Sequence, residues 1–199
     1  MEKIEIFGEY DKDLKSNVVI KTIDHFEDFK KGITVFRCAP YYEILSEQDM
    51  KDEYANYVDN GIAFGCYLDG ELAGLNCIVY EDDKKHSIAF GEDDRIAYYA
   101  GLAVRKEHRG KGIGKLLVNQ TDLFLQNLNM FDYSYARILV KGSMSEGIFR
   151  KYDFEDILVD GKLIVDDVDY ERNDPTVPTS DQRKYMGKAF TKTYTLKRR

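Results

Sequence analysis

The strongest constraint on the fold of this chain is one continuous run, Ile96 to Leu117, in which an apolar segment passes through alternating glycines into an amphipathic segment. Every residue from Ile96 to Val104 is apolar or aromatic, which predicts a strand that is covered on both faces of a sheet. The basic segment from Arg105 to Arg109 ends that strand. The run therefore predicts a buried strand, a tight turn and a helix in direct succession.

Three glycines at alternate positions, Gly110, Gly112 and Gly114, form the turn. A glycine-rich backbone can approach a ligand closely and present several N–H groups to it. Apolar residues at helical spacing predict that a helix starts here: Ile113, Leu116, Leu117, Phe124 and Leu128. Unpaired N–H groups and the helix dipole attract anions at a helix N-terminus. The turn is therefore predicted to bind a pyrophosphate, and a turn that only connects strand to helix is the alternative.

Two common glycine-rich motifs do not fit this turn. A P-loop, GxxxxGK[ST], needs a glycine where Arg109 stands and a hydroxyl residue where Leu116 stands, and a dinucleotide fingerprint needs a glycine at Lys115. The pattern that remains is V-x-x-x-x-R-G-x-G-I-G, from Val104 to Gly114. It resembles the acetyl-CoA-binding motif of the GCN5-related N-acetyltransferase (GNAT) family.

This resemblance implies an α/β (α+β) fold in which a mixed, mostly antiparallel sheet is flanked by helices, with acetyl-CoA as co-substrate. In the family, the central strand and the next strand splay apart after the turn, and the pantetheine arm lies between them. A backbone N–H of the central strand stabilises the oxyanion, and Leu102 matches that position, with Gly101 as a candidate β-bulge residue. The cofactor-binding residues implied are Leu102, Ala103, Val104, Arg109, Gly110, Lys111, Gly112, Ile113, Gly114, Ser143 and Phe149.

The segment from Ile148 to Phe154 departs from the family pattern LYxKxGF. It places Phe149 where a tyrosine commonly protonates the departing thiolate, and Asp153 where a glycine is usual. Tyr152 lies three residues after Phe149 on about the same helical face. Tyr152 is therefore a candidate for the catalytic acid, although an aromatic at such a position is more often part of the core. Water could otherwise supply the proton.

The activity implied is transfer of acetyl from acetyl-CoA to a primary amine by direct attack in a ternary complex. A small-molecule amine is the first acceptor expected, and a protein N-terminus or lysine is the second. The acids Glu92, Asp93 and Asp94, just before the central strand, either attract a cationic amine or form a solvated turn. Because Phe149 replaces the expected tyrosine, a noncatalytic CoA-binding or regulatory module of the same fold is the alternative function.

Composition narrows the class of protein further. The chain has 199 residues, of which 43% are hydrophobic, so a single domain with a substantial core is the simplest expectation. Its net charge of −7 argues against nucleic acid as a partner. The charged N-terminus and the absence of any stretch of about 20 apolar residues predict a cytoplasmic location with no membrane partner. The few cysteines and histidines lack ligand spacing, so no metal is expected.

The rest of the pattern predicts the elements around this motif. Strands are expected at 16–22, 62–68, 71–80, 86–90, 135–140 and 189–196, and helices at 24–36, 46–57 and from 143, where Ser143 and Glu146 have the form of a capping box. Asp69-Gly70 and Asp160-Gly161 predict hairpin turns.

The C-terminal part carries charge in two blocks. Acids dominate from Asp153 to Asp174 and bases dominate after Asp181, so the tail either packs on the acidic stretch or on a partner subunit, or both blocks are solvated faces. The link at about 160–184 is a hairpin or loop excursion and a candidate lid or homodimer contact. Its acids suit a cationic amine, although a purely structural role is as plausible.

Overall fold

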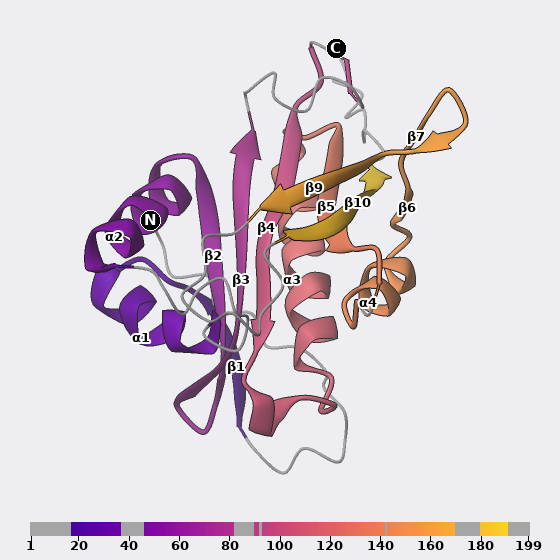
Figure 1. Ribbon diagram of the computed structural model, residues 1–199. Helices are drawn as coiled ribbons and strands as arrows, with labels where there is room; N and C mark the ends of the chain where they lie inside the picture. The colour runs from indigo at the N-terminus through magenta and orange to yellow at the C-terminus, as the bar shows by residue number, and fades with distance from the viewer. Residues whose placement is uncertain are drawn as a thin grey trace, which may run out of the picture.

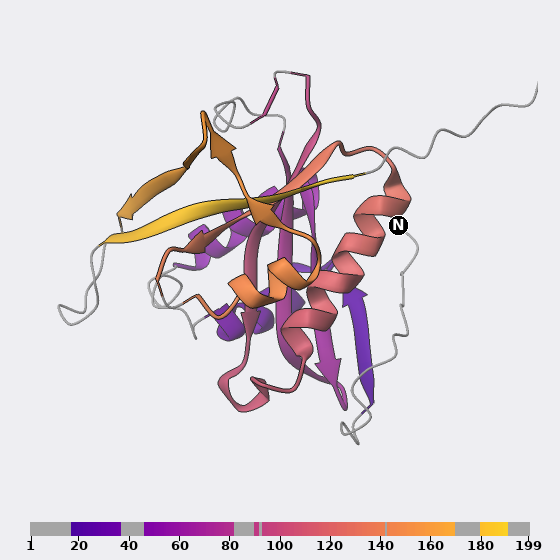
Figure 2. The same ribbon diagram turned by 90° about the vertical axis from the view of Figure 1, so that its right-hand side faces the viewer.

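The computed structural model describes residues 17–36, 46–81, 90–91, 93–141, 143–169 and 180–190. Its elements, drawn in Figures 1 and 2, are β1 (Val18–Thr22), α1 (Phe26–Phe36), α2 (Glu47–Asp59), β2 (Gly61–Leu68), β3 (Glu71–Glu81), β4 (Ile96–Val104), η3 (Lys106–His108), α3 (Ile113–Leu128), β5 (Tyr133–Leu139), α4 (Glu146–Lys151), β6 (Glu155–Asp156), β7 (Leu158–Val159), β8 (Lys162–Leu163), β9 (Val165–Asp169) and β10 (Ser180–Ala189). Most of the expected strands at 86–90 and 189–196 lies outside the described residues.

One large sheet organises the molecule. Its strands run in the order β1-β2-β3-β4-β5-β10-β6, with β9 also paired to β10. Every pair is antiparallel except β4 with β5, which is parallel. Helices α1 and α2 cover one face of the sheet, and α3 and α4 cover the other (Figure 2). This arrangement confirms the predicted mixed, mostly antiparallel sheet flanked by helices.

A predicted hairpin turn and a predicted helix cap are both present in the first part of the chain. Asp69 and Gly70 join β2 to β3 with φ of +49° and +87°, as a two-residue hairpin turn requires. Ser46 caps α2, because its Oγ accepts the Asp49 N–H at 3.1 Å while the Asp49 carboxylate accepts the Ser46 N–H at 2.8 Å.

Helix α3 packs on the sheet through the apolar face that the spacing predicted. Of the residues predicted for that face, Ile113 and Leu117 are buried, and Leu116 and Phe124 are partly buried against the core. Leu128, which the same pattern placed on that face, is 39% exposed because the helix ends there at Asn129. The buried face fixes α3 beside β4 and sets the position of the glycine turn that precedes it.

The neighbouring strands β4 and β5 pair only at their beginnings, where Ile96–Tyr99 lies against Tyr133–Ala136. Just after this segment β4 contains a β-bulge, since Tyr99 pairs with Ile78 of β3 and Gly101 with Cys77. The extra residue is therefore Ala100, one position before the glycine that we expected. A bulge bends the strand that carries it, and the later halves of β4 and β5 are not paired with each other.

The C-terminal strand starts earlier than the sequence predicts. Strand β10 runs from Ser180 to Ala189 and pairs with β5 and with β9, whereas the alternation pattern pointed to 189–196. Its inward-facing lysines obscured the pattern: Lys188 forms an ion pair with Asp122 of α3 at 2.8 Å, and Lys184 pairs with Glu146 and Asp156. The basic strand thus lies partly against the acidic stretch.

Among the described residues, no helix is both long enough and apolar enough to span a bilayer. The expected cytoplasmic location remains a prediction.

The pair of Lys188 and Asp122 offers a test of how β10 is held against α3. Both side chains are largely buried, and Asp122 also accepts a hydrogen bond from Gln126 at 2.8 Å. We expect Lys188→Met to lower the free energy of unfolding by about 3 kcal/mol in urea denaturation, because it leaves a buried carboxylate without its cation. Adding Asp122→Asn should recover much of that loss, and a double variant no more stable than Lys188→Met would contradict this account.

Candidate active site

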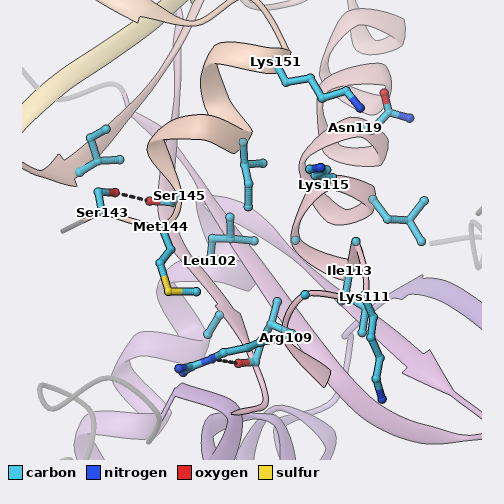
Figure 3. A pocket seen from close by; sticks show the side chains of 18 of the residues that line it. Leu102, Arg109, Lys111, Ile113, Lys115, Asn119, Ser143, Met144, Ser145 and Lys151 are labelled. Carbon is cyan, nitrogen blue, oxygen red and sulfur yellow. Dashed lines mark hydrogen bonds between the residues drawn. The ribbon is translucent and has the colours of Figure 1, made fainter. Parts of the chain in front are cut away.

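A pocket of about 850 Å³ opens where β4 and β5 part (Figure 3). It is lined by residues 102–104 at the end of β4 and by residues 137–139 of β5. The glycine turn, the first residues of α3 and the inner side of α4 complete the wall. The strand, turn and helix predicted as one unit therefore meet at a single concave site.

The three glycines of the turn serve two different purposes. Gly110 and Gly112 have φ of +78° and +83°, a left-handed conformation that side chains rarely adopt, and a Cβ on either would meet no protein atom within 4 Å. Their open side faces ligand space. Gly114, in contrast, allows close packing, because a Cβ there would lie 2.9 Å from Ile148 Cδ1 of α4.

The N-terminus of α3 presents hydrogen-bond donors to the pocket. Gly112 is the N-cap and makes no side-chain cap, and the first helical bond runs from Leu116 N–H to Gly112 O at 3.0 Å. The N–H groups of the three residues between them have no acceptor inside the helix. Together with the helix dipole, they form a site suited to phosphate oxygens.

The charge of the lining is strongly positive. Its cations are Arg109, Lys111, Lys115, Arg137, Lys151 and Arg183. Among the lining residues that the structure describes, no Asp or Glu occurs, although the whole chain carries a net charge of −7. Figure 3 shows Lys151 of α4 extending toward α3. This concentration of cations on an acidic chain favours a polyanionic ligand.

Arg109 and Lys111 also stabilise the turn itself. The Arg109 Nε donates to the Val104 carbonyl oxygen at 3.1 Å, so the side chain joins the turn to the end of β4 (Figure 3). Lys111 Nζ lies 3.3 Å from His108 Nδ1.

The backbone of β4 directs a donor into the gap. The Arg105 N–H donates to the Ala73 carbonyl oxygen of β3 at 2.9 Å. N–H groups alternate in direction along a strand, so that of Ala103 also points toward β3, while those of Leu102 and Val104 point away from it. On that side lies the gap to β5, and Leu102 lines the pocket. The position expected to stabilise an oxyanion thus has the required orientation.

The structure separates Tyr152 from Phe149. Tyr152 is the C-cap residue of α4, is partly buried and lines the pocket. Desolvation first, and then the charge of Asp122, raise the pKa of its phenol above the ordinary 10.0. Phe149 is 2% exposed and packs edge-to-face on Tyr99 and Phe154 in the core. It is absent from the pocket wall. The expected contact of Phe149 with the cofactor stays a prediction, which this position in the core does not favour.

Ser143 lies at the pocket, but the expected capping box is only half present. Its Oγ accepts the Glu146 N–H at 3.3 Å and lies 2.9 Å from the Ser145 Oγ (Figure 3). The Glu146 carboxylate, however, accepts hydrogen bonds from Arg150 and Lys184. Helix α4 accordingly begins at Glu146 rather than at Ser143.

Two of the acids proposed to attract an amine have other partners. Asp94 accepts the Gly91 N–H at 2.6 Å, and Asp166 of the 160–184 link pairs with Arg137. Asp93 is exposed and lies off the pocket wall, and Glu92 lies outside the described residues. These contacts indicate structural roles for the described acids.

Sequence reasoning missed several residues of the pocket wall. Lys115 and Asn119 lie on α3 four residues apart, a spacing that puts them on one helical face with the turn. Lys151 is the last residue of α4. Arg137 interrupts an otherwise apolar strand, and a lone charge in a buried strand was the signal that could have found it.

The comparisons with known proteins agree with this fold and give its family. The family model described as Acetyltransferase (GNAT) family matches residues 31–132, about half of the chain. This chain therefore belongs to the GNAT family, whose members use acetyl-CoA, and the findings support an N-acetyltransferase. A search of curated proteins finds no match.

Several solved acetyltransferases share the fold at low sequence identity. The ribosomal-protein-S18-alanine N-acetyltransferase of Escherichia coli superimposes with a TM-score of 0.64 at 12% identity, covering 90% of this chain and 99% of that one. An N-acetyltransferase of Staphylococcus aureus gives 0.64 at 14%, covering 87% and 99%. Arabidopsis thaliana NAA60, solved with a bisubstrate analogue, gives 0.63 at 16%, covering 89% and 100%. At these identities the likeness shows the fold alone.

The glycine turn can be tested by a charge placed in it. We expect Gly112→Asp to abolish acetyl-CoA binding measured by calorimetry, because a side chain and a negative charge enter the phosphate site. Gly70→Asp is the matched control, since Gly70 also has a positive φ with nothing within 4 Å and lies in the β2–β3 turn, away from the pocket. It should bind acetyl-CoA as the unmodified protein does. Binding retained by Gly112→Asp would refute the placement of the phosphates.

Proposed function

We propose that this protein transfers the acetyl group of acetyl-CoA to a primary amine, which attacks the thioester directly in a ternary complex. The observation that carries the proposal is the pocket at the parting of β4 and β5. It combines a phosphate-binding turn, a backbone donor in the gap and a protonated phenol.

The binding step rests on the turn and the cations around it. N–H groups at the start of α3 suit a pyrophosphate, and Lys111, Lys115 and Lys151 supply positive charge on three sides of the same space. The apolar ends of β4 and β5 suit the pantetheine arm. Acetyl-CoA, once bound, supplies an activated acetyl thioester, and the remaining chemistry falls to this chain's own groups.

Two groups are placed to act during acyl transfer, one by stabilising negative charge and one by donating a proton. The Leu102 N–H points into the gap and would stabilise negative charge on the carbonyl oxygen. Tyr152 would donate a proton to the departing thiolate, because its raised pKa keeps the phenol protonated in neutral solution. Holding both reactants in one pocket supplies the proximity that direct attack needs.

The two cysteines that the structure describes support direct attack rather than a covalent intermediate. Cys66 and Cys77 are buried in the core, and desolvation raises the pKa of Cys66 to about 12. A thiol in that setting is not a nucleophile at neutral pH. Neither residue lines the pocket.

Turnover on a panel of amines tests the activity. Acetyl-CoA consumption, read as released thiol, should appear with at least one of the polyamines, amino acids, aminoglycosides and peptides tested, with cofactor binding measured in parallel. We expect a small molecule to be the acceptor. Peptides belong in the panel because the Escherichia coli neighbour is named for a ribosomal protein acceptor. Tight CoA binding without turnover on any amine would favour the noncatalytic CoA-binding module instead.

The role of Tyr152 can be tested separately. Tyr152→Phe should lower kcat by up to about 100-fold while leaving the Kd of acetyl-CoA nearly unchanged. Because the phenol loses its proton only above pH 10, the deficit should stay constant from about pH 7 to 9. Tyr54→Phe is the matched control, since Tyr54 also has a pKa raised by burial but lies on α2, off the pocket wall. An unchanged rate for Tyr152→Phe would show that Tyr152 is not the catalytic acid.

A further inference from the structure

The pocket passes through the sheet. Successive residues of a strand point to opposite faces. All three of residues 102–104 on β4, and all three of residues 137–139 on β5, nevertheless line it. The wall is therefore made by the edges of the two parted strands. One end of the pocket is the glycine turn beside α3, and the other reaches the face of the sheet that carries α1 and α2.

The second end of the pocket carries two arginines. Arg137 of β5 is opposite Tyr185 of β10, and Arg183 lies two residues before Tyr185, so all three side chains share one face. The neighbouring residues of β5 and β10, Ile138 and Met186, are buried in the core beneath α3 and α4. Arg137 and Arg183 thus belong to the face opposite the glycine turn, yet both line the pocket.

Contacts with β9 and β10 hold the side chain of Arg137 in place. Its guanidinium forms an ion pair with Asp166 of β9, and the Tyr185 hydroxyl donates to the same carboxylate at 3.1 Å. Its Cζ also lies 5.6 Å from the centre of the Tyr185 ring. Asp166 itself is not part of the pocket wall. This support holds in place a planar donor group on a residue that lines the pocket.

The charges at this end select the acceptor. Arg137 and Arg183 bring two guanidinium groups to this end, and no Asp or Glu is among the described residues of the pocket wall. A wall of this charge repels a polyamine and attracts an anion. An arginine fork matches the geometry of a carboxylate with two parallel N–H···O bonds. We propose that the acceptor is an amine that itself carries a carboxylate, such as a free amino acid. This inference rests on the proposed function. Arg137 and Arg183 bind the carboxylate while the amine faces the gap between β4 and β5.

Paired acceptors that differ only in the carboxylate test this proposal. For a series of amino acids, their amides and simple polyamines, kcat/KM should be highest for the free acids. Arg183→Gln should raise KM for a free amino acid by about 10- to 100-fold, with little change for its amide. Arg137→Lys, which keeps a charge beside Asp166, should raise KM for the acid less than Arg183→Gln does. In either variant the Kd of acetyl-CoA should change less than the KM for the free acid does.

Arg95→Gln is the matched control, because Arg95 also pairs with a carboxylate, that of Asp132 at 3.2 Å, but lies off the pocket wall. It should leave KM for both acceptors unchanged. A parallel measurement of product binding to the CoA complex, comparing N-acetyl amino acids with their amides, gives the same comparison without turnover, and equal affinities would overturn the proposal.

The outcomes separate this inference from the proposed function. Turnover that favours amides or polyamines over the free acids would overturn the carboxylate assignment and leave the acetyltransferase intact. If the unmodified protein shows neither acetyl-CoA binding nor turnover, the proposed function is overturned, and the acceptor assignment with it. A preference for the acids that survives Arg183→Gln and Arg137→Lys unchanged would show that these arginines do not bind the acceptor.

Discussion

The parting of β4 and β5 is the feature on which the rest of the site depends. The two strands pair through Ile96–Tyr99 and then separate after the bulge at Ala100. Where the two strands separate, backbone groups of β4 have no hydrogen-bond partner on β5. An unpaired backbone group costs free energy unless water or a ligand hydrogen-bonds to it. The same separation opens the pocket and connects its two ends. A continuous ladder between these strands would close the site.

Ion pairs within the fold neutralise several charged side chains of this molecule. Lys184 pairs with Glu146 and Asp156, Lys188 with Asp122, and Arg137 with Asp166. The lysine pairs hold β10 against α3, α4 and β6, and the pair of Arg137 with Asp166 joins β5 to β9. The pocket wall retains its cations, so an acidic chain presents a positive cavity to a polyanionic co-substrate.

Strand β10 shows why local pattern was a poor guide in the C-terminal half. Its lysines face inward and its Arg183 and Tyr185 face the opposite side, so hydrophobic alternation is weak although the strand is central. Its place depends on acids far away in the chain, such as Asp122. No window of neighbouring residues contains that information, and the expected strand was consequently placed several residues late.

The sequence by itself determined the strand from Ile96 to Val104, the glycine turn and α3, because local conformation and helical spacing dictate them; Gly110 and Gly112 adopt the left-handed backbone that only glycine tolerates easily. Tertiary structure decided which side chains reach the cavity. Phe149 and Tyr152 are three residues apart on one short helix, yet the first packs into the core and the second lines the pocket. Arg137, Arg183 and Lys151 come together only because β5, β10 and α4 do. Their meeting is a property of sheet order and strand separation, which are set by contacts between distant residues.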